Sequence, residues 1–148
     1  MRLIVDGDAC PVKDLLLRAA QRLDVPLLLV SNKPMGFGRE PGVTPVIVPA
    51  GADEADQWIA DEVRPEDLVI TADIPLAARV VEKGATAIGH RGEIFDEASI
   101  GERLATWAFL KTMREGGLET GGPKPFDNKD RAAFASALDR WLTKHRRG

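Results

Sequence analysis

Acidic side chains stand in three short groups along the first half of the chain, and each group lies where an apolar stretch gives way to a helical pattern. Asp6 and Asp8 flank a single glycine directly after the apolar residues 3–5. Clustered carboxylates repel one another unless a cation neutralises them, and their oxygen atoms are the ligands that Mg²⁺ and Mn²⁺ prefer. The pattern therefore predicts a divalent metal site. Its candidate ligands are Asp6, Asp8, Asp53, Glu54, Asp56 and Asp73.

Each of these acids also has a structural explanation, because aspartate is favoured at helix N-termini and complements the helix dipole. Asp53, with Asp56 three residues later, fits the start of a helix, and Asp73 fits another because Pro75 follows it. Capping accounts for any one acid taken alone. It does not readily require aspartates at both positions 6 and 8, nor the acidic excess at 53–56, so the set as a whole favours a metal site.

The elements that position these acids are predicted from alternating strand and helix patterns over the first 90 residues. Apolar stretches typical of buried strands occupy residues 3–5 and 27–30, and further strands are predicted at 44–48, 67–71 and 85–88. Helical patterns fill residues 11–24, 53–64 and 74–83. This alternation predicts an α/β fold, a three-layer sandwich around a mainly parallel sheet. Strand-to-helix transitions of such sheets gather at the carboxyl edge, where ligands bind, so the acidic groups are expected to share one cleft.

The last third of the chain is predicted to be helical at residues 96–114 and 130–144, with a Gly- and Pro-rich block at 121–126 that cannot form regular structure. We expect a single domain over residues 1–148, in which residues 96–148 form a helical extension packed on the sandwich. Trp58, Trp107 and Trp141 each lie on an apolar helical face, and we therefore assign them to the core rather than to a stacking surface.

Composition narrows the protein class. The 148 residues are 44% hydrophobic and 29% charged, with a net charge of −3, which is ordinary for a soluble domain and argues against a large nonspecific nucleic-acid surface. No apolar run approaches the roughly 18 residues of a membrane helix, and the first residues do not resemble a secretory signal. The single cysteine, Cys10, excludes an internal disulfide and a multi-cysteine zinc site. We expect a cytoplasmic protein in which Cys10 is a packed thiol.

Polar and basic residues near the predicted strand ends are candidates for contacting a substrate. Thr71, Ser31 and Asn32 end predicted strands, where their side chains could bond a phosphate or a bound water. The loop at 33–42 carries Lys33 and Arg39 as candidate phosphate contacts. Each of these residues could equally be an ordinary strand-end residue or a solvated surface charge without a role in binding.

Four blocks of the sequence resemble one bacterial family. They are residues 5–13 (VDGDACPVK), 51–59 (GADEADQWI), 67–77 (DLVITADIPLA) and 121–126 (GGPKPF), the last followed by Asp130 and Arg131. In this order they resemble the uncharacterised YaiI/YqxD family, which is similar to PIN-like nucleases. The resemblance covers nearly the whole chain and implies a single PIN-like domain.

The resemblance also implies roles for the acids. PIN-like nucleases cleave RNA or flap DNA with Mg²⁺ or Mn²⁺, so Asp6, Asp56 and Asp73 would be the core metal-binding and catalytic acids. Asp8, Asp53 and Glu54 would be supplementary ligands. Many PIN domains carry a further aspartate shortly after the last of the core acids, whereas residues 74–83 of this chain hold only Glu82. The number of metal ions therefore stays open.

Three functions follow as expectations. The first is a metal-dependent nuclease that hydrolyses phosphodiester bonds in RNA or structured DNA. The second is a non-catalytic, metal-dependent module that binds nucleic acid or a nucleotide. The third is an aspartyl-phosphate phosphatase, with Asp6 as nucleophile and Asp8 as acid, because Asp-x-Asp opens that class of enzyme. Phosphatases of that class usually have Thr or Val where this chain has Cys10.

Overall fold

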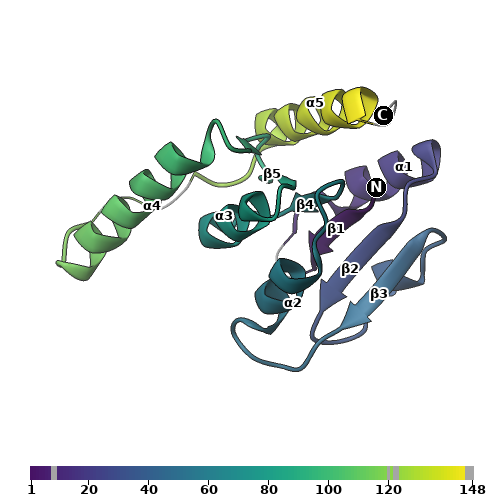
Figure 1. Cartoon of the computed structure of the whole chain (residues 1–148), viewed down its shortest axis with the longest axis horizontal. Coiled ribbons are helices and arrows are strands. Elements are labelled where there is room, and N and C mark those ends of the chain that lie inside the picture. Colours follow the sequence, from purple (N-terminus) through teal and green to yellow (C-terminus); the bar gives the residue numbers. More distant parts are fainter. Residues whose placement is uncertain (8–9, 120, 122–123, 146–148) are drawn as a thin grey trace.

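The computed structural model describes residues 1–7, 10–119, 121 and 124–145, and its centre is a six-stranded sheet (Figure 1). The strand order is β3-β2-β1-β4-β5-β6, with the first five strands parallel and β6 antiparallel to β5. The strands are β1 (Leu3–Asp6), β2 (Leu27–Ser31), β3 (Val43–Ile47), β4 (Leu68–Ile70), β5 (Thr86–Ile88) and β6 (Ile94–Phe95). The predicted α/β fold with a mainly parallel sheet is confirmed.

Helices cover both faces of this sheet. They are α1 (Lys13–Leu23), α2 (Glu54–Glu62), α3 (Ile74–Glu82), α4 (Ile100–Glu115) and α5 (Asn128–His145). Because side chains alternate along a strand, Leu3 and Val5 of β1 pack in one cluster with α1 and α5, while Ile4 packs in a second cluster with α2 and α3. β1 is therefore buried on both faces, as its continuous apolar run predicts.

Two short elements lie in stretches without a periodic sequence pattern. Residues 36–39 form a 3-10 helix, η1 (Gly36–Arg39), inside the loop that follows β2. β6 is a strand of two residues that turns back on β5, with Gly89 N–H donating to the carbonyl of Glu93. A strand of this length is too short to show a period of two, and pairing with β5 decides its conformation.

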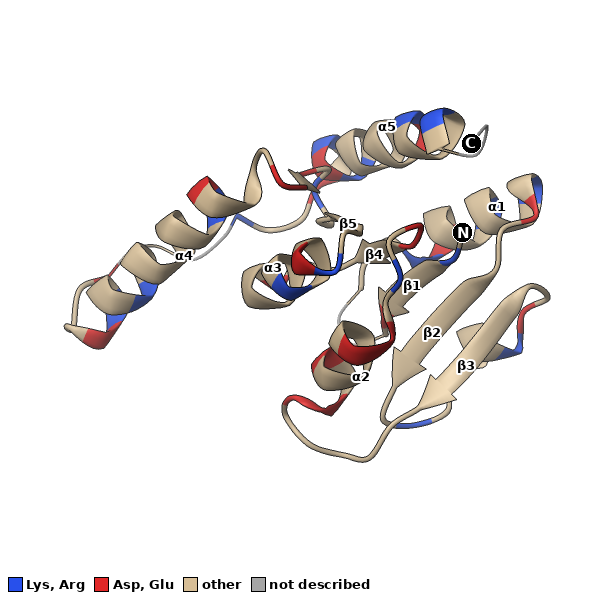
Figure 2. Ribbon diagram, viewed as in Figure 1, with Lys and Arg blue, Asp and Glu red and all other residues tan. Residues whose placement is uncertain are grey.

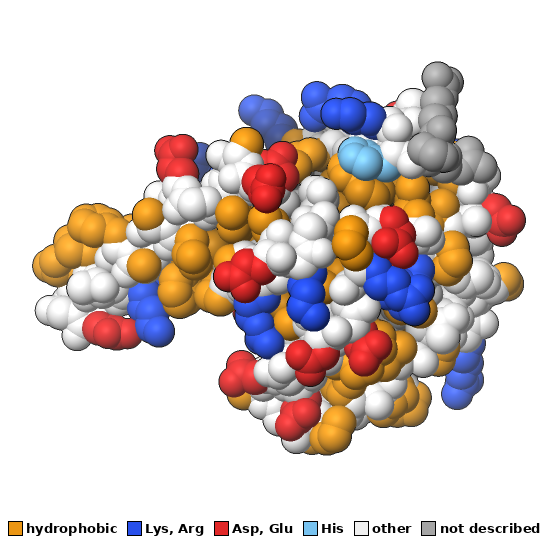
Figure 3. All heavy atoms as spheres, in the orientation of Figure 1, with side chains coloured by type: hydrophobic (Ala, Val, Ile, Leu, Met, Phe, Trp, Pro, Cys, Tyr) orange, Lys and Arg blue, Asp and Glu red, His pale blue; other side chains and the backbone are white. Residues whose placement is uncertain are grey.

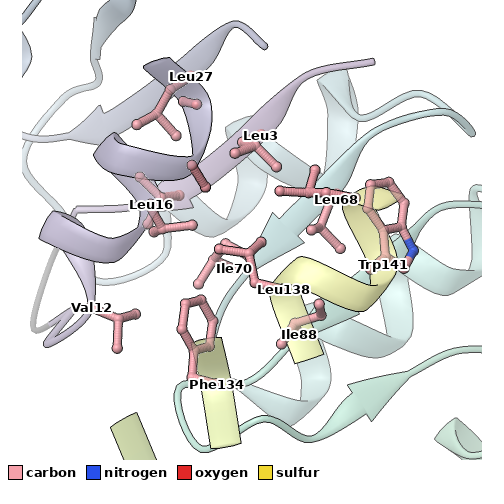
Figure 4. Packing of buried hydrophobic residues seen from close by; sticks show 14 of the residues in the cluster. Leu3, Val12, Leu16, Leu27, Leu68, Ile70, Ile88, Phe134, Leu138 and Trp141 are labelled. Atoms are coloured by element: carbon pink, nitrogen blue, oxygen red, sulfur yellow. The ribbon is translucent and has the colours of Figure 1, made fainter. Parts of the chain in front are cut away.

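α5 belongs to the core of the sandwich. Its buried side chains face the sheet, and Figure 4 shows Trp141 beside Leu68, with Phe134 and Leu138 near Ile70 and Ile88. They are Phe134, Ala137, Leu138, Trp141 and Leu142. Removing these side chains from water supplies the main force that holds the C-terminal helix on the sheet.

Polar contacts fix the start of α5 and give the block around residues 124–131 a structural role. Arg91, just after β5, donates to Asp130 at 2.6 Å and to the carbonyl of Lys124. The side chains of Asp127 and Asp130 each accept from the other's backbone N–H, and Arg131 pairs with Asp14 of α1. These contacts join α5 to both α1 and the β5–β6 turn.

α4 lies beside α3 without contributing a buried side chain to the core. The structure describes all of α4, and none of its side chains is buried. Figure 3 shows hydrophobic side chains gathered on this projecting helix, among them Phe109, which is 61% exposed. Of the three tryptophans assigned to the core, Trp141 is buried and Trp58 is half-buried against the second cluster. Trp107 is half-buried but belongs to neither cluster, so its assignment was wrong. Apolar periodicity shows which face of a helix is apolar but not whether another element covers it.

No helix among the described residues has the length and apolar character needed to cross a membrane.

Candidate functional site

The candidate site lies at the carboxyl edge of the sheet, where the strand order reverses. From β1 the chain crosses through α1 to β2 on one side, and from β4 it crosses through α3 to β5 on the other. The carboxyl ends of β1 and β4 are neighbours, since Val5 pairs with Ile70. Open α/β sheets bind ligands at such a switch point because the diverging connections leave a crevice there. Asp6 is the last residue of β1, and Asp73 follows β4 as the residue before α3.

Asp56 joins this pair from the first turn of α2. Partial burial, followed by the charges of Asp73 and Asp6, raises the pKa of Asp56 from 3.8 to about 6. A hydrogen bond between the side chains of Asp56 and Asp73 and the charge of Asp53 add to the effect. Such charge effects are strongest when the groups lie within about 4–6 Å of one another, so the shift indicates that these carboxyl groups are near neighbours. The fold therefore brings carboxyl groups from β1, α2 and the β4–α3 junction into one cluster, and Figure 2 shows acids gathered on α2 and the loop before it.

Asp73 is both a helix cap and a member of the cluster. Its side chain accepts the backbone N–H of Leu76 at 3.0 Å, and Pro75 occupies the first turn of α3. Its own backbone N–H donates to the hydroxyl of Thr71 at 3.0 Å. The two explanations of Asp73 that the sequence allowed, a cap and a candidate site residue, are compatible in the same side chain.

The acids at the start of α2 differ among themselves. Asp53 is the residue before the first turn, but its side chain makes no capping hydrogen bond, and it acts on Asp56 through its charge. Glu54 is exposed, and its side chain lies against Gly51. Asp8 lies outside the described residues. Asp6 is half-buried at the end of β1.

Gly7 allows the chain to leave β1 in a tightly packed place. A Cβ atom at this position would lie 3.0 Å from the carbonyl oxygen of Val30 and 3.1 Å from Cδ1 of Leu29. The Gly7 N–H donates to that same carbonyl at 2.7 Å. The glycine between the first two aspartates is therefore required by close approach to β2, which fixes where the backbone after Asp6 runs.

The predicted substrate contacts divide into buried and exposed groups. Ser31 and Thr71 are buried, and their hydroxyls bond local backbone groups: Ser31 donates to the carbonyl of Lys33 at 2.8 Å, and Thr71 accepts from Asp73. Both side chains thus shape the chain at the carboxyl edge. Asn32, Lys33 and Arg39 are exposed on the loop between β2 and β3.

The chemistry of the cluster fits a hard divalent cation. Its donors are carboxylate oxygens, and their mutual repulsion, seen in the raised pKa of Asp56, is what a bound cation would relieve. Within the described ranges, however, no three His, Cys, Asp or Glu side chains are arranged so that they could hold an ion as they stand. Closer approach of the side chains, or a ligand from outside the described ranges, is needed to complete the coordination.

The structure contains a groove near the acidic cluster that the sequence did not predict. Ile74, the residue directly after Asp73, lines a groove shared with Trp107 and Arg103 of α4. The apolar periodicity of α4 made Trp107 look like a core residue, so nothing in the sequence separated it from Trp141. Two features of the sequence could have pointed to the groove. Ile74 directly follows Asp73, and Arg103 lies four residues before Trp107.

Comparison with known proteins places the chain among uncharacterised bacterial proteins. Among curated relatives, the UPF0178 protein of Geobacter sulfurreducens is 50% identical over 145 residues, covering 96% of each chain. That of Trichlorobacter lovleyi is 47% identical over 146 residues, covering 97% of this chain and 95% of the relative. That of Burkholderia cenocepacia strain HI2424 is 48% identical over 147 residues, covering 98% of both. These names describe no activity.

A solved structure and a family model complete the comparison. The structure of yeast methylglyoxal/isovaleraldehyde reductase Gre2 complexed with NADPH has a TM-score of 0.39 and 13% identity, covering 78% of this chain and 50% of the reductase. A likeness of that size supports no inference about function. The family model described as "Uncharacterized BCR, YaiI/YqxD family" matches residues 4–144. With this match over nearly its whole length, the chain belongs to the YaiI/YqxD family.

Proposed function

We propose that the protein is a metal-dependent nuclease that hydrolyses phosphodiester bonds in RNA or structured DNA, with a PIN-like active site. The observation that supports this most directly is the meeting of Asp6, Asp56 and Asp73, from three separate segments, at the switch point of the sheet. These are the acids that the family resemblance implies as core metal ligands.

Asp6, Asp56 and Asp73 would hold Mg²⁺ or Mn²⁺, with Asp8, Asp53 and Glu54 as further carboxylates nearby. Bound there, the cation would supply an activated water and stabilise negative charge on the leaving oxygen. The protein's own part is positioning. The Thr71 hydroxyl holds the backbone of Asp73, and the cap to Leu76 orients the Asp73 carboxylate. Lys33 and Arg39, exposed on the β2–β3 loop, are the candidate contacts to substrate phosphates.

The test is hydrolysis in Mn²⁺ of labelled single-stranded RNA, flap DNA and a phosphomonoester, comparing the wild type with Asp73→Asn. Asparagine caps a helix as well as aspartate does, so this substitution keeps the start of α3 and removes the charge. We expect nucleic-acid cleavage to fall by at least about a hundredfold, because altering even the groups behind metal ligands costs 10–100-fold. Asp61→Asn is the matched control, since Asp61 is an exposed acid of α2 whose side chain accepts from Gln57.

The other outcomes discriminate among the functions. Cleavage that is equal in the wild type and Asp73→Asn contradicts the proposed site and indicates a contaminating nuclease. Turnover of the phosphomonoester with a trappable phosphate on Asp6 supports the aspartyl-phosphate phosphatase instead. Metal-dependent binding of nucleic acid without hydrolysis of any substrate supports a binding module.

A further inference from the structure

A groove opens between the start of α3 and the first half of α4, next to the acidic cluster. Its volume is about 460 Å³, within the range of small-ligand sites, and its walls include Ile74, Arg103, Trp107 and Leu110. Figure 1 shows α4 passing α3 and continuing beyond it. Ile74 follows Asp73 directly in the chain, which places one wall of the groove one residue from the candidate site.

The groove combines an aromatic and apolar surface with cations. Trp107 is half-buried, and Ile74 and Leu110 line the groove with it. The ammonium of Lys111 is 5.2 Å from the centre of the Trp107 ring, and the guanidinium of Arg103 lines the same groove. Glu102 and Thr106 complete the walls with groups that can accept or donate hydrogen bonds. A flat ring beside positive charges is the combination with which proteins hold a base and its phosphate.

We propose that this groove binds one unpaired nucleotide of a single-stranded nucleic acid, with the base against Trp107 and its phosphate near Arg103 and Lys111. The proposal rests on the proposed function and deepens it, because the bound nucleotide would lie next to the phosphodiester that the acidic cluster cleaves. A base can stack on a protein ring only when it has left its neighbours in the strand, so the groove selects unpaired nucleotides over a duplex.

Arg103 gives this groove a cation that suits a phosphate. Glu102 lines the groove with it, and Lys111, beside the groove, also pairs with Glu115 of α4 at 3.9 Å. The neighbouring acidic cluster is suited to a metal ion and a phosphate rather than to an apolar partner. Other apolar side chains of α4, such as Phe109, lie outside the groove walls and therefore provide an internal control.

The experiment measures binding of a short, end-labelled single-stranded RNA, its DNA counterpart and the matching duplex by fluorescence anisotropy, with EDTA present so that no cleavage occurs. Trp107→Ala should weaken binding of the single strands at least about fivefold, the low end of one lost base stack. Trp107→Phe should keep most of the affinity, and Trp107→Leu, which keeps apolar volume without a ring, should lose it. Arg103→Gln should weaken binding and reduce its dependence on salt. Phe109→Ala should bind as the wild type does.

Several results would overturn the inference. They are unchanged binding by Trp107→Ala and Trp107→Leu, an equal loss in Phe109→Ala, or a duplex that binds as tightly as the single strand. A dimer, seen by light scattering, that both Trp107→Ala and Phe109→Ala dissociate would identify α4 as a protein interface instead. Ring-dependent binding without cleavage in Mn²⁺ supports the groove and rejects the nuclease. Cleavage that Trp107→Ala leaves unchanged rejects the groove alone.

Discussion

At the residue scale, Asp73 shows that a helix cap and a candidate metal ligand can be the same side chain. Its carboxylate accepts the N–H of Leu76, and the same side chain is hydrogen-bonded to Asp56. A carboxylate has two oxygens and about four acceptor positions, so one cap does not exhaust it. Deciding between helix capping and metal binding for each acid separately is therefore not informative. What distinguishes a candidate site is the number of acids from different segments that lie close together.

The raised pKa of Asp56 predicts a pH-dependent loss of stability. In the unfolded chain this carboxyl loses its proton near pH 3.8, but in the native cluster only near pH 6. Between these values the native state binds more protons, so the free energy of unfolding falls as pH rises and stays lowered above pH 6. Asp56→Asn should therefore be more stable than the wild type at pH 7, by about 1 kcal/mol after allowing for solvent screening, and equal to it below pH 4.

Urea unfolding at several pH values without divalent ions measures this difference. Asp61→Asn serves as the control because it removes the same charge from an exposed position of the same helix. Its effect should stay within about 0.5 kcal/mol and show no trend with pH. A difference between Asp56→Asn and the wild type that does not vary with pH would contradict the coupling of Asp56 to its neighbours.

At the element scale, the strands and helices of the sandwich could be predicted because burial imposes a period on their sequences. The apolar runs of β1 and β4 are buried in the sheet, and α1 buries one face, with Leu16, Ala19 and Ala20. β6 could not be predicted, because its two residues carry no period and its conformation follows from pairing with β5. Tertiary contacts rather than local sequence decide an element of that size.

The β5–β6 turn makes a testable contact with α5 at Gly92. This glycine has a φ of +90°, and a Cβ atom there would lie 2.7 Å from the carbonyl oxygen of Ala133. Gly92→Ala therefore adds a backbone collision to the cost of a positive φ. We expect it to lower the free energy of unfolding by about 3 kcal/mol or more.

Gly42→Ala separates the two contributions. Gly42 has a similar φ of +84° but no atom within 4 Å of the added Cβ, so only the conformational cost remains, about 1 kcal/mol. Both variants are compared by their midpoints in urea. Equal losses at the two positions would show that the turn can move away from α5.

At the scale of the whole molecule, the alternation of elements predicted that the acids gather at one edge, but the strand order that makes β1 and β4 neighbours became visible only in the fold. Contact between the side chains of Asp56 and Asp73 depends on that strand order and on the angle at which α2 meets the sheet.

The same dependence on tertiary contacts explains why Trp107 was wrongly assigned to the core. The sequence patterns of α4 and α5 are both apolar on one side, yet α5 lies in the core and α4 projects from it.

This difference between the last two helices predicts opposite consequences for the same substitution. Phe134 of α5 is fully buried against the sheet, and Phe134→Ala should cost about 3–5 kcal/mol through lost burial and the cavity left behind. Phe109 of α4 is 61% exposed, and Phe109→Ala should stay within about 0.5 kcal/mol of the wild type. Urea unfolding of the two variants compares them directly. If Phe109→Ala were as destabilising as Phe134→Ala, the surface of α4 around Phe109 would have to be covered in solution.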